Sequence, residues 1–297
     1  MNALQLLREK YGFGEGRALY ELVMRRRFGL SRTDILLGKD TTLSAKDKAE
    51  LQIIVDRVYK GEPVQYVLGS EEFCGHEFLV APGVLIPRPE TQQLVHLVEQ
   101  HLAPNSSVLD VVTGSGCIAI TLALAGYRVT AVDVSEEALA IAKQNAERLG
   151  AEVEFVKGDI LKSEKLKVKN ESNQLKETEN ETNSDFSLFT FHFSLNAIVS
   201  NPPYICEKEA AEMDDNVLLH EPHLALFVPD DDPLVFYRAI ADYGLLHLDE
   251  GGWLFFEVNK EYAKQVAELL LQKGYKEVKT FKDQYDNERF VCARRKN

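Results

Sequence analysis

The strongest candidate for a binding or catalytic site in this sequence is a run of four residues, Asn201-Pro202-Pro203-Tyr204. They follow a short apolar run, residues 197–200, which is typical of a buried strand. Two successive prolines cannot continue a sheet, because each lacks an N–H and has its φ fixed at about −65°. We therefore expect the strand to end at Asn201, and in open α/β sheets ligands bind beyond the carboxyl ends of the strands.

This turn suits the binding of a planar –NH2 group. The Asn201 side-chain oxygen and the Pro202 carbonyl can each accept one N–H, while the Tyr204 ring stacks on the plane of the group. The nitrogen lone pair then points away from the protein, toward an electrophile. Asparagine and proline also favour ordinary turns, so these four residues taken alone leave a purely structural turn open.

A second candidate site is the turn made by Thr113, Gly114, Ser115 and Gly116. It lies between a predicted strand, residues 108–112, and a predicted helix, residues 117–125. This succession is typical of the nucleotide-binding start of a doubly wound sheet, where glycines let the backbone approach a ligand and a helix N-terminus offers free N–H groups. The turn lacks the GKS/T of phosphate loops and the G-x-G-x-x-G spacing of dinucleotide sites.

Acidic residues end the next two predicted strands. Asp133 closes a strand over residues 128–133, where an acceptor for ribose hydroxyls belongs. Asp159 follows a strand over residues 153–156, where it can accept from an exocyclic amine while Ile160 packs on an aromatic base. Each acid also has a purely structural interpretation. Asp133 can cap the helix at 135–149, and Asp159 can be an ordinary turn residue.

Charge and composition limit the class of partner. Among 297 residues, 34 are Lys or Arg and 47 are Asp or Glu, a net charge of −13 that argues against free nucleic acid as a partner. The longest apolar stretch, residues 117–125, is too short to cross a bilayer. We therefore expect no membrane association.

The cysteines and histidines predict neither a disulfide framework nor a metal site. No two cysteines form a CxxC pair, and His220 and His223 have no clear third ligand nearby. We read the cysteines as reduced thiols of a cytoplasmic protein, which we expect to be a monomer; they are Cys74, Cys117, Cys206 and Cys292.

The chain divides into regions of different texture. Residues 1–62 show helical periodicity, including a segment at 45–59 that begins with Ser44 and Asp47. Residues 63–88 read as a β-hairpin connector with strands at 64–68 and 77–80. From 89 to 297 strands and helices alternate, ending in two strands, 276–281 and 289–293, that we expect to pair antiparallel. Residues 162–190 are almost wholly polar and read as a disordered insertion.

At this point the sequence resembles a known family. Asp110 to Gly116, Asp133, Asp159 and Asn201-Pro202-Pro203-Tyr204 resemble the class I S-adenosylmethionine-dependent methyltransferases that act on planar amino groups. More narrowly, the chain resembles the PrmC/HemK family, which methylates the glutamine of the Gly-Gly-Gln motif in peptide chain release factors. This narrower resemblance is carried by Pro63-Val64-Gln65-Tyr66-Val67-Leu68-Gly69, Leu85-Ile86-Pro87-Arg88-Pro89-Glu90-Thr91, Asn201-Pro202-Pro203-Tyr204-Ile205, Glu221-Pro222 with Ala225-Leu226, and the terminal Asp286 to Ala293.

The resemblance implies an α/β fold: a seven-stranded Rossmann-like methyltransferase sheet with a small N-terminal helical bundle that recognises the substrate and a β-hairpin connector. It implies S-adenosyl-L-methionine as cofactor and release factors as the partner. By position, the cofactor is bound by Val112, Thr113, Gly114, Ser115, Gly116, Asp133, Asp159, Ile160 and Asn201, and the substrate glutamine by Asn201, Pro202, Pro203 and Tyr204. Of these, Asn201, Pro202 and Tyr204 are the expected catalytic residues.

The sequence departs from the family pattern at Val112, at Glu257-Val258-Asn259 and in the insertion at 162–190, which is not part of that pattern. Val112 stands where the family usually has glycine or another small residue, so we expect it to crowd the cofactor slightly. Glu257-Val258-Asn259 replaces a more common string, which leaves the role of that edge open. Two other substrates also stay open: a glutamine of a ribosomal protein, and adenine N6 of DNA, which is likewise a planar amine.

Overall fold

The computed structural model describes residues 2–163 and 195–296. The chain forms two compact units: one comprises Met1–Glu71, Val80–Pro82 and Met213–Glu221, the other Glu72–Leu79, Gly83–Glu212 and Pro222–Asn297. Most of the predicted insertion, from residue 164 on, lies outside the described residues. The domain boundaries after residues 62 and 88 stay predictions.

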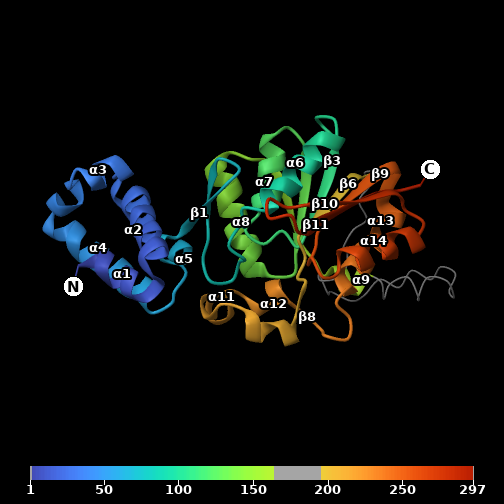
Figure 1. Ribbon diagram of the computed structural model, residues 1–297. Coiled ribbons are helices and arrows are strands. Elements are labelled where there is room, and N and C mark those ends of the chain that lie inside the picture. Colours follow the sequence, from blue (N-terminus) through green and yellow to red (C-terminus); the bar gives the residue numbers. More distant parts are fainter. Residues whose placement is uncertain (1, 164–194, 297) are drawn as a thin grey trace, which may run out of the picture. The chain divides into compact units, whose positions relative to one another are not determined.

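The first unit is helical, and its N-terminal helices are the blue elements of Figure 1. The predicted helix at 45–59 is confirmed as α4, which begins where the Ser44 side chain accepts from the Asp47 N–H. Leu51, Ile54, Val55 and Val58 recur at helical spacing and are buried in the core of this unit. The helical elements are α1 (Ala3–Tyr11), α2 (Phe13–Phe28), α3 (Arg32–Leu36), η1 (Lys39–Thr42), α4 (Ala45–Tyr59), α5 (Val64–Leu68) and α11 (Asp215–His220).

One predicted strand of the connector was wrong. Residues 64–68, whose valines and tyrosine favour a strand, form the short helix α5. Pro63 precedes the helix and Gly69, with a φ of 78°, ends it in the left-handed region, so the flanking residues mark helix ends. Val64 and Tyr66 are buried in this form, and burial overrides a weak local preference for strand.

The hairpin of the connector exists, but it begins later. Its strands are β1 (Ser70–Phe73) and β2 (His76–Leu79) on either side of Cys74 and Gly75. The second strand agrees with the prediction at 77–80.

The second unit contains a seven-stranded sheet in the order β10-β11-β9-β6-β3-β4-β5. Strands β9, β6, β3, β4 and β5 run parallel to one another. Strand β11 pairs antiparallel with β9 and with β10, and the pairing of the last two strands is as predicted. The strands are β3 (Ser107–Val111), β4 (Arg128–Asp133), β5 (Val153–Lys157), β6 (Leu195–Ser200), β9 (Leu248–Glu257), β10 (Lys276–Lys282) and β11 (Glu288–Arg294). The predicted α/β methyltransferase-type sheet is confirmed.

Helices cover both faces of this sheet (Figure 1). One core contains apolar residues of α6, α7 and α8, the other of α13 and α14. Successive residues of the central strand serve opposite cores, Val108 the first and Leu109 the second, as the two-residue period of a strand requires. The helices are α6 (Thr91–His101), α7 (Cys117–Leu124), α8 (Glu136–Leu149), α9 (Ile160–Ser163), α12 (His223–Leu226), α13 (Val235–His247) and α14 (Ala263–Gln272); smaller elements are β7 (Ile205–Cys206), η3 (Glu207–Glu212) and β8 (Phe227–Val228).

Asn145 of α8 connects the hairpin to the glycine turn. Its side chain is fully buried, accepts from the Leu79 N–H (2.6 Å) and donates to the carbonyls of Leu79 and Ser115 (3.0 Å each). Replacing it leaves these buried backbone groups without partners, which is costly.

We expect Asn145→Ala to lower the free energy of unfolding by about 3 kcal/mol. The measurement is urea denaturation followed by the fluorescence of Trp253, the single tryptophan of the chain, which lies in β9 of the same unit. The matched control is Gln144→Ala on the exposed side of α8, which should change the free energy by less than about 0.5 kcal/mol. Equal effects of the two substitutions would contradict the bridging role.

Candidate functional site

A cavity of about 230 Å³ lies beyond the carboxyl ends of β3, β4 and β6. One buried water needs only roughly 10–15 Å³ on such a measure, so the space suits an organic ligand. Strand order reverses here, because β4 follows β3 on one side of the sheet and β6 lies on the other. Ligands of open α/β sheets bind at such a reversal.

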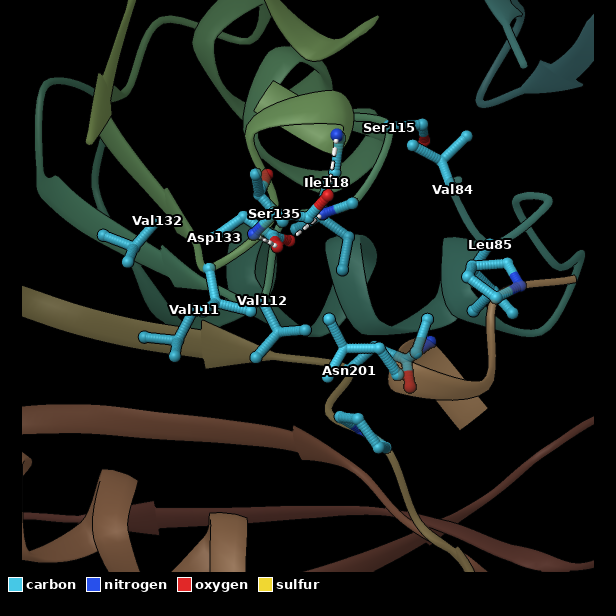
Figure 2. Close-up of a pocket in the computed structure, with 18 of the residues that line it drawn as sticks. Val84, Leu85, Val111, Val112, Ser115, Ile118, Val132, Asp133, Ser135 and Asn201 are labelled. Atoms are coloured by element: carbon cyan, nitrogen blue, oxygen red, sulfur yellow. Dashed lines mark hydrogen bonds between the residues drawn. The ribbon is translucent and has the colours of Figure 1, made fainter. Parts of the chain in front are cut away.

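The structure brings most of the predicted residues to this one cavity. Figure 2 shows Val112, Ser115, Asp133 and Asn201 around it. The predicted residues that line it are Val112, Thr113, Gly114, Ser115, Asp133, Asp159, Ile160, Asn201 and Pro203. Gly116, Pro202 and Tyr204 do not line it: Gly116 is the N-cap of α7, and the other two lie in the turn behind Asn201.

The turn after β3 is built from residues in the left-handed region. Val112, Gly114 and Gly116 have φ angles of 63°, 55° and 81°. A Cβ on Gly116 would lie 2.8 Å from Ile120 Cδ1 and 3.1 Å from Ala142 Cβ, so helix packing as well as conformation requires glycine there. A positive φ is strained for a β-branched residue, so the conformation itself explains why glycine or a small residue suits position 112.

Asp133 stabilises this turn through hydrogen bonds to its backbone. Its carboxylate accepts from the Gly114 N–H (2.8 Å) and from the Ser135 N–H (2.9 Å), and burial raises the pKa of the group. Ser135 itself caps α8 by accepting from the Ala138 N–H. The Asp133 carboxylate also accepts from the Val134 N–H. Asp133 therefore has a structural role, yet one of its four lone-pair positions is left for a ligand.

Asp159 and Ile160 line the cavity at the end of β5. The Asp159 carboxylate accepts from the Leu161 N–H (3.0 Å) and lies 3.1 Å from Lys162 Nζ. Ile160 is buried with 4% of its surface exposed. The structure thus gives Asp159 an ordinary turn contact as well as a place at the cavity, and its role toward a ligand stays a prediction.

Two residues that sequence reasoning missed hold the Asn201 turn. Asn201 Nδ2 donates to Thr91 Oγ1 (3.2 Å), and the Thr91 hydroxyl donates to Glu257 Oε2 (2.7 Å). The Tyr204 hydroxyl donates to the other oxygen of the same carboxylate, Glu257 Oε1 (3.2 Å). The signal for Glu257 was present: like Asp133, it is an acid at the end of a strand, and it follows the apolar run 253–256.

Glu257 and Asp110 are buried carboxyl groups on either side of β6. Each side chain is completely inaccessible, and burial raises the pKa of each to about 7. Thr113 Oγ1 donates to Asp110 Oδ2 (2.6 Å), so Asp110 fixes the start of the glycine turn. Glu257 does the same for the Asn201 turn through Thr91 and Tyr204.

Comparisons with known proteins bear on this site. A PrmC N-terminal domain model matches residues 2–69, and a methyltransferase domain model matches residues 108–175. The chain is 42% identical over 293 residues to the release factor glutamine methyltransferase of Bacteroides thetaiotaomicron, covering 98% of this chain and 97% of the relative. It belongs to the release factor glutamine methyltransferase family. The family's protein in Bacillus subtilis is 36% identical, covering 92% of this chain and 89% of that one.

Solved structures support the fold alone. A 16S rRNA N2 G1207 methyltransferase from T. thermophilus, in complex with AdoMet and guanosine, aligns with a TM-score of 0.51 at 18% identity, covering 76% of this chain and 50% of that chain. A methyltransferase from Pyrococcus furiosus aligns with a TM-score of 0.50 at 16% identity, covering 82% of this chain and 98% of that chain.

The family uses S-adenosylmethionine as cofactor, and the residues around the cavity fit it. The remaining lone pair of the Asp133 carboxylate suits a ribose hydroxyl. Apolar side chains of Val112, Val134 and Ile160 line the same cavity and suit a base. In the part of the chain that the structure describes, no helix has the length and apolar character to cross a membrane.

The strain at Val112 is testable against its neighbour. Val112→Gly removes about 1–2 kcal/mol of left-handed strain but adds about 0.5–1 kcal/mol of backbone entropy, so we expect a change within about 1 kcal/mol. Val111→Gly has no strain to relieve at a fully packed position and should cost about 3 kcal/mol. Urea denaturation measures the free energy of unfolding of both variants. A large decrease for Val112→Gly would contradict the interpretation that the backbone at Val112 is strained.

Proposed function

We propose that this protein transfers the methyl group of S-adenosylmethionine to the side-chain amide nitrogen (N5) of the glutamine in the Gly-Gly-Gln motif of peptide chain release factors. The observation that carries the proposal is the Asn201 amide at the edge of the cavity, with its Nδ2 bound to Thr91. This leaves Asn201 Oδ1 to accept an N–H of a substrate amide.

Each residue of the Asn201-Pro202-Pro203-Tyr204 turn has its own role toward the substrate amide. Asn201 Oδ1 and the Pro202 carbonyl each accept one N–H of the glutamine amide, Pro203 keeps the turn rigid, and the Tyr204 ring packs against the amide plane. An amide nitrogen is a weak nucleophile, because its lone pair is delocalised into the carbonyl. The two acceptors orient the nitrogen and stabilise the positive charge that develops on it.

The remaining predicted residues bind the cofactor. Residues 112–115 would hold its methionine part, Asp133 would accept from the ribose, and Asp159 and Ile160 would flank the adenine. Gly116 supports this turn as the N-cap of α7. S-adenosylmethionine supplies a methyl group already activated on a sulfonium, so alignment contributes much of the rate; well-oriented reactions gain roughly 7–11 kcal/mol in this way. The helical first unit recognises the release factor, and the reaction takes place in the cytoplasm, where that substrate acts.

The decisive experiment offers methyl-labelled S-adenosylmethionine and three acceptors separately: release factor, ribosomal proteins and unmethylated DNA. We expect label on the Gly-Gly-Gln glutamine, located by peptide mass, and none on a release factor whose motif glutamine is replaced by alanine. Label only on a ribosomal protein or on DNA would replace the proposed substrate with that acceptor.

Asn201 separates catalysis from cofactor binding. We expect Asn201→Ala to lower the rate of methyl transfer by roughly 100-fold or more, because a preorganised hydrogen-bonding group in an active site contributes about that much. Cofactor affinity, measured by calorimetry, should change little. If cofactor affinity falls as far as the rate does, Asn201 belongs to the cofactor site and not to the acceptor site.

A further inference from the structure

The first and last residues of the Asn201-Pro202-Pro203-Tyr204 turn are both tied to one buried carboxylate. Asn201 reaches Glu257 Oε2 through the Thr91 hydroxyl, and Tyr204 contacts Glu257 Oε1 directly. Strand register brings these groups together, because Ser200 of β6 lies opposite Phe256 of β9 and the following residues emerge side by side. Thr91 and Glu257 are 2% and 0% exposed, so neither is a solvated surface group.

The chain of hydrogen bonds has a direction. An ionised carboxylate only accepts, and a threonine hydroxyl has a single hydrogen. Because Thr91 donates that hydrogen to Glu257, it can only accept from Asn201. The Asn201 NH2 group must therefore face Thr91, which turns the amide oxygen away from Thr91 and makes it the acceptor for a substrate N–H.

We infer that Glu257 is a positioning residue of methyl transfer, which acts through Thr91 to fix the orientation of the Asn201 amide and through its other oxygen to hold Tyr204. The inference rests on the proposed function. It gives a role to the Glu257-Val258-Asn259 edge, which the sequence left open. Asn259 adds to it, since its Nδ2 donates to the Tyr204 carbonyl (3.3 Å).

Protonation of Glu257 would remove the fixed donor-to-acceptor direction of the hydrogen bonds from Asn201 through Thr91 to Glu257. The titratable and charged groups that act on it are Glu90 before α6, Tyr204, Tyr237 of α13 and Arg289 of β11. Burial is the largest influence on the pKa of Glu257 and raises it, as does Glu90, while Arg289 and the hydrogen bonds from Thr91 and Tyr204 lower it. The net effect raises the pKa to about 7. A proton on Glu257 makes it a donor, so the competent form exists above about pH 7 and is lost as the pH falls through that value.

The first test is a pair of substitutions at Thr91. Thr91→Val keeps the shape and removes the hydroxyl, so the Asn201 amide loses its fixed partner; we expect kcat to fall by about 100-fold, with little change in KM for release factor or in cofactor affinity. Thr91→Ser keeps the hydroxyl and should restore most of the rate. Equal rates for the valine and serine variants would overturn the inference.

The second test is the pH profile. In the wild type we expect kcat to rise with pH through about 7. Glu257→Gln is neutral at every pH and its amide donates as well as accepts, so this variant should be slower above pH 7 and lack the inflection. A wild-type rate that is unchanged across this range, or an inflection that survives in Glu257→Gln, would count against the role of Glu257.

A third measurement does not depend on the substrate. The side-chain amide resonances of Asn201, assigned in a ¹⁵N spectrum by their loss in Asn201→Asp, should shift with a midpoint near pH 7 in the wild type and stay constant in Glu257→Gln. Failure of the wild type to label release factor would overturn the proposed function alone. Asn201 resonances that ignore pH in the wild type would overturn the positioning role, whatever the acceptor is.

Discussion

The parallel register of β4, β3, β6 and β9 is the constraint on which the site depends. Val111 of β3 lies opposite Ser200 of β6, and Ser200 lies opposite Phe256 of β9, so all three strands end at one edge of the sheet. The Ser200 hydroxyl donates to the Val111 carbonyl (2.6 Å) and ties the two central strand ends together. Segments far apart in sequence, residues 111–115, 132–135 and 158–160 and Asn201, thereby face one cavity.

Buried carboxylates stabilise the loops at that edge. Removing such groups from water is costly unless they are hydrogen-bonded, and each accepts at least one hydrogen bond at the edge that it supports. Asp110 binds Thr113, Asp133 binds the backbone of Gly114 and Ser135, and Glu257 binds Thr91 and Tyr204. The hydrogen bonds that offset desolvation are therefore the same ones that fix the geometry of the site.

Val112 affects both the backbone path and the shape of the cavity. Its positive φ of 63° directs the chain from β3 into the glycine turn, and its side chain lines the cavity. The fold tolerates a strained valine because the strand before it and the helix after it are firmly packed, with Val111 and Ile118 both buried. Strain of this kind persists where the surrounding structure determines the backbone.

Much of this arrangement could be predicted from local pattern. The strand, glycine turn and helix around Thr113, the acid at Asp133 and the proline turn at Asn201 all carry signals within a few residues, and the structure has these elements where they were expected. The exception was the segment at 64–68, where β-branched residues favoured a strand and burial against α2 and α4 made a helix.

The sequence by itself determined the elements, the parallel sheet and the residue types at the strand ends. Only the tertiary structure decided which of those residues touch. Thr91 and Glu257 are separated by 166 positions, yet their side chains are hydrogen-bonded, because the contact depends on strand order and register, which no local periodicity encodes. The hydrogen-bond direction that orients Asn201 exists only once these distant residues meet, with Thr91 and Glu257 both buried.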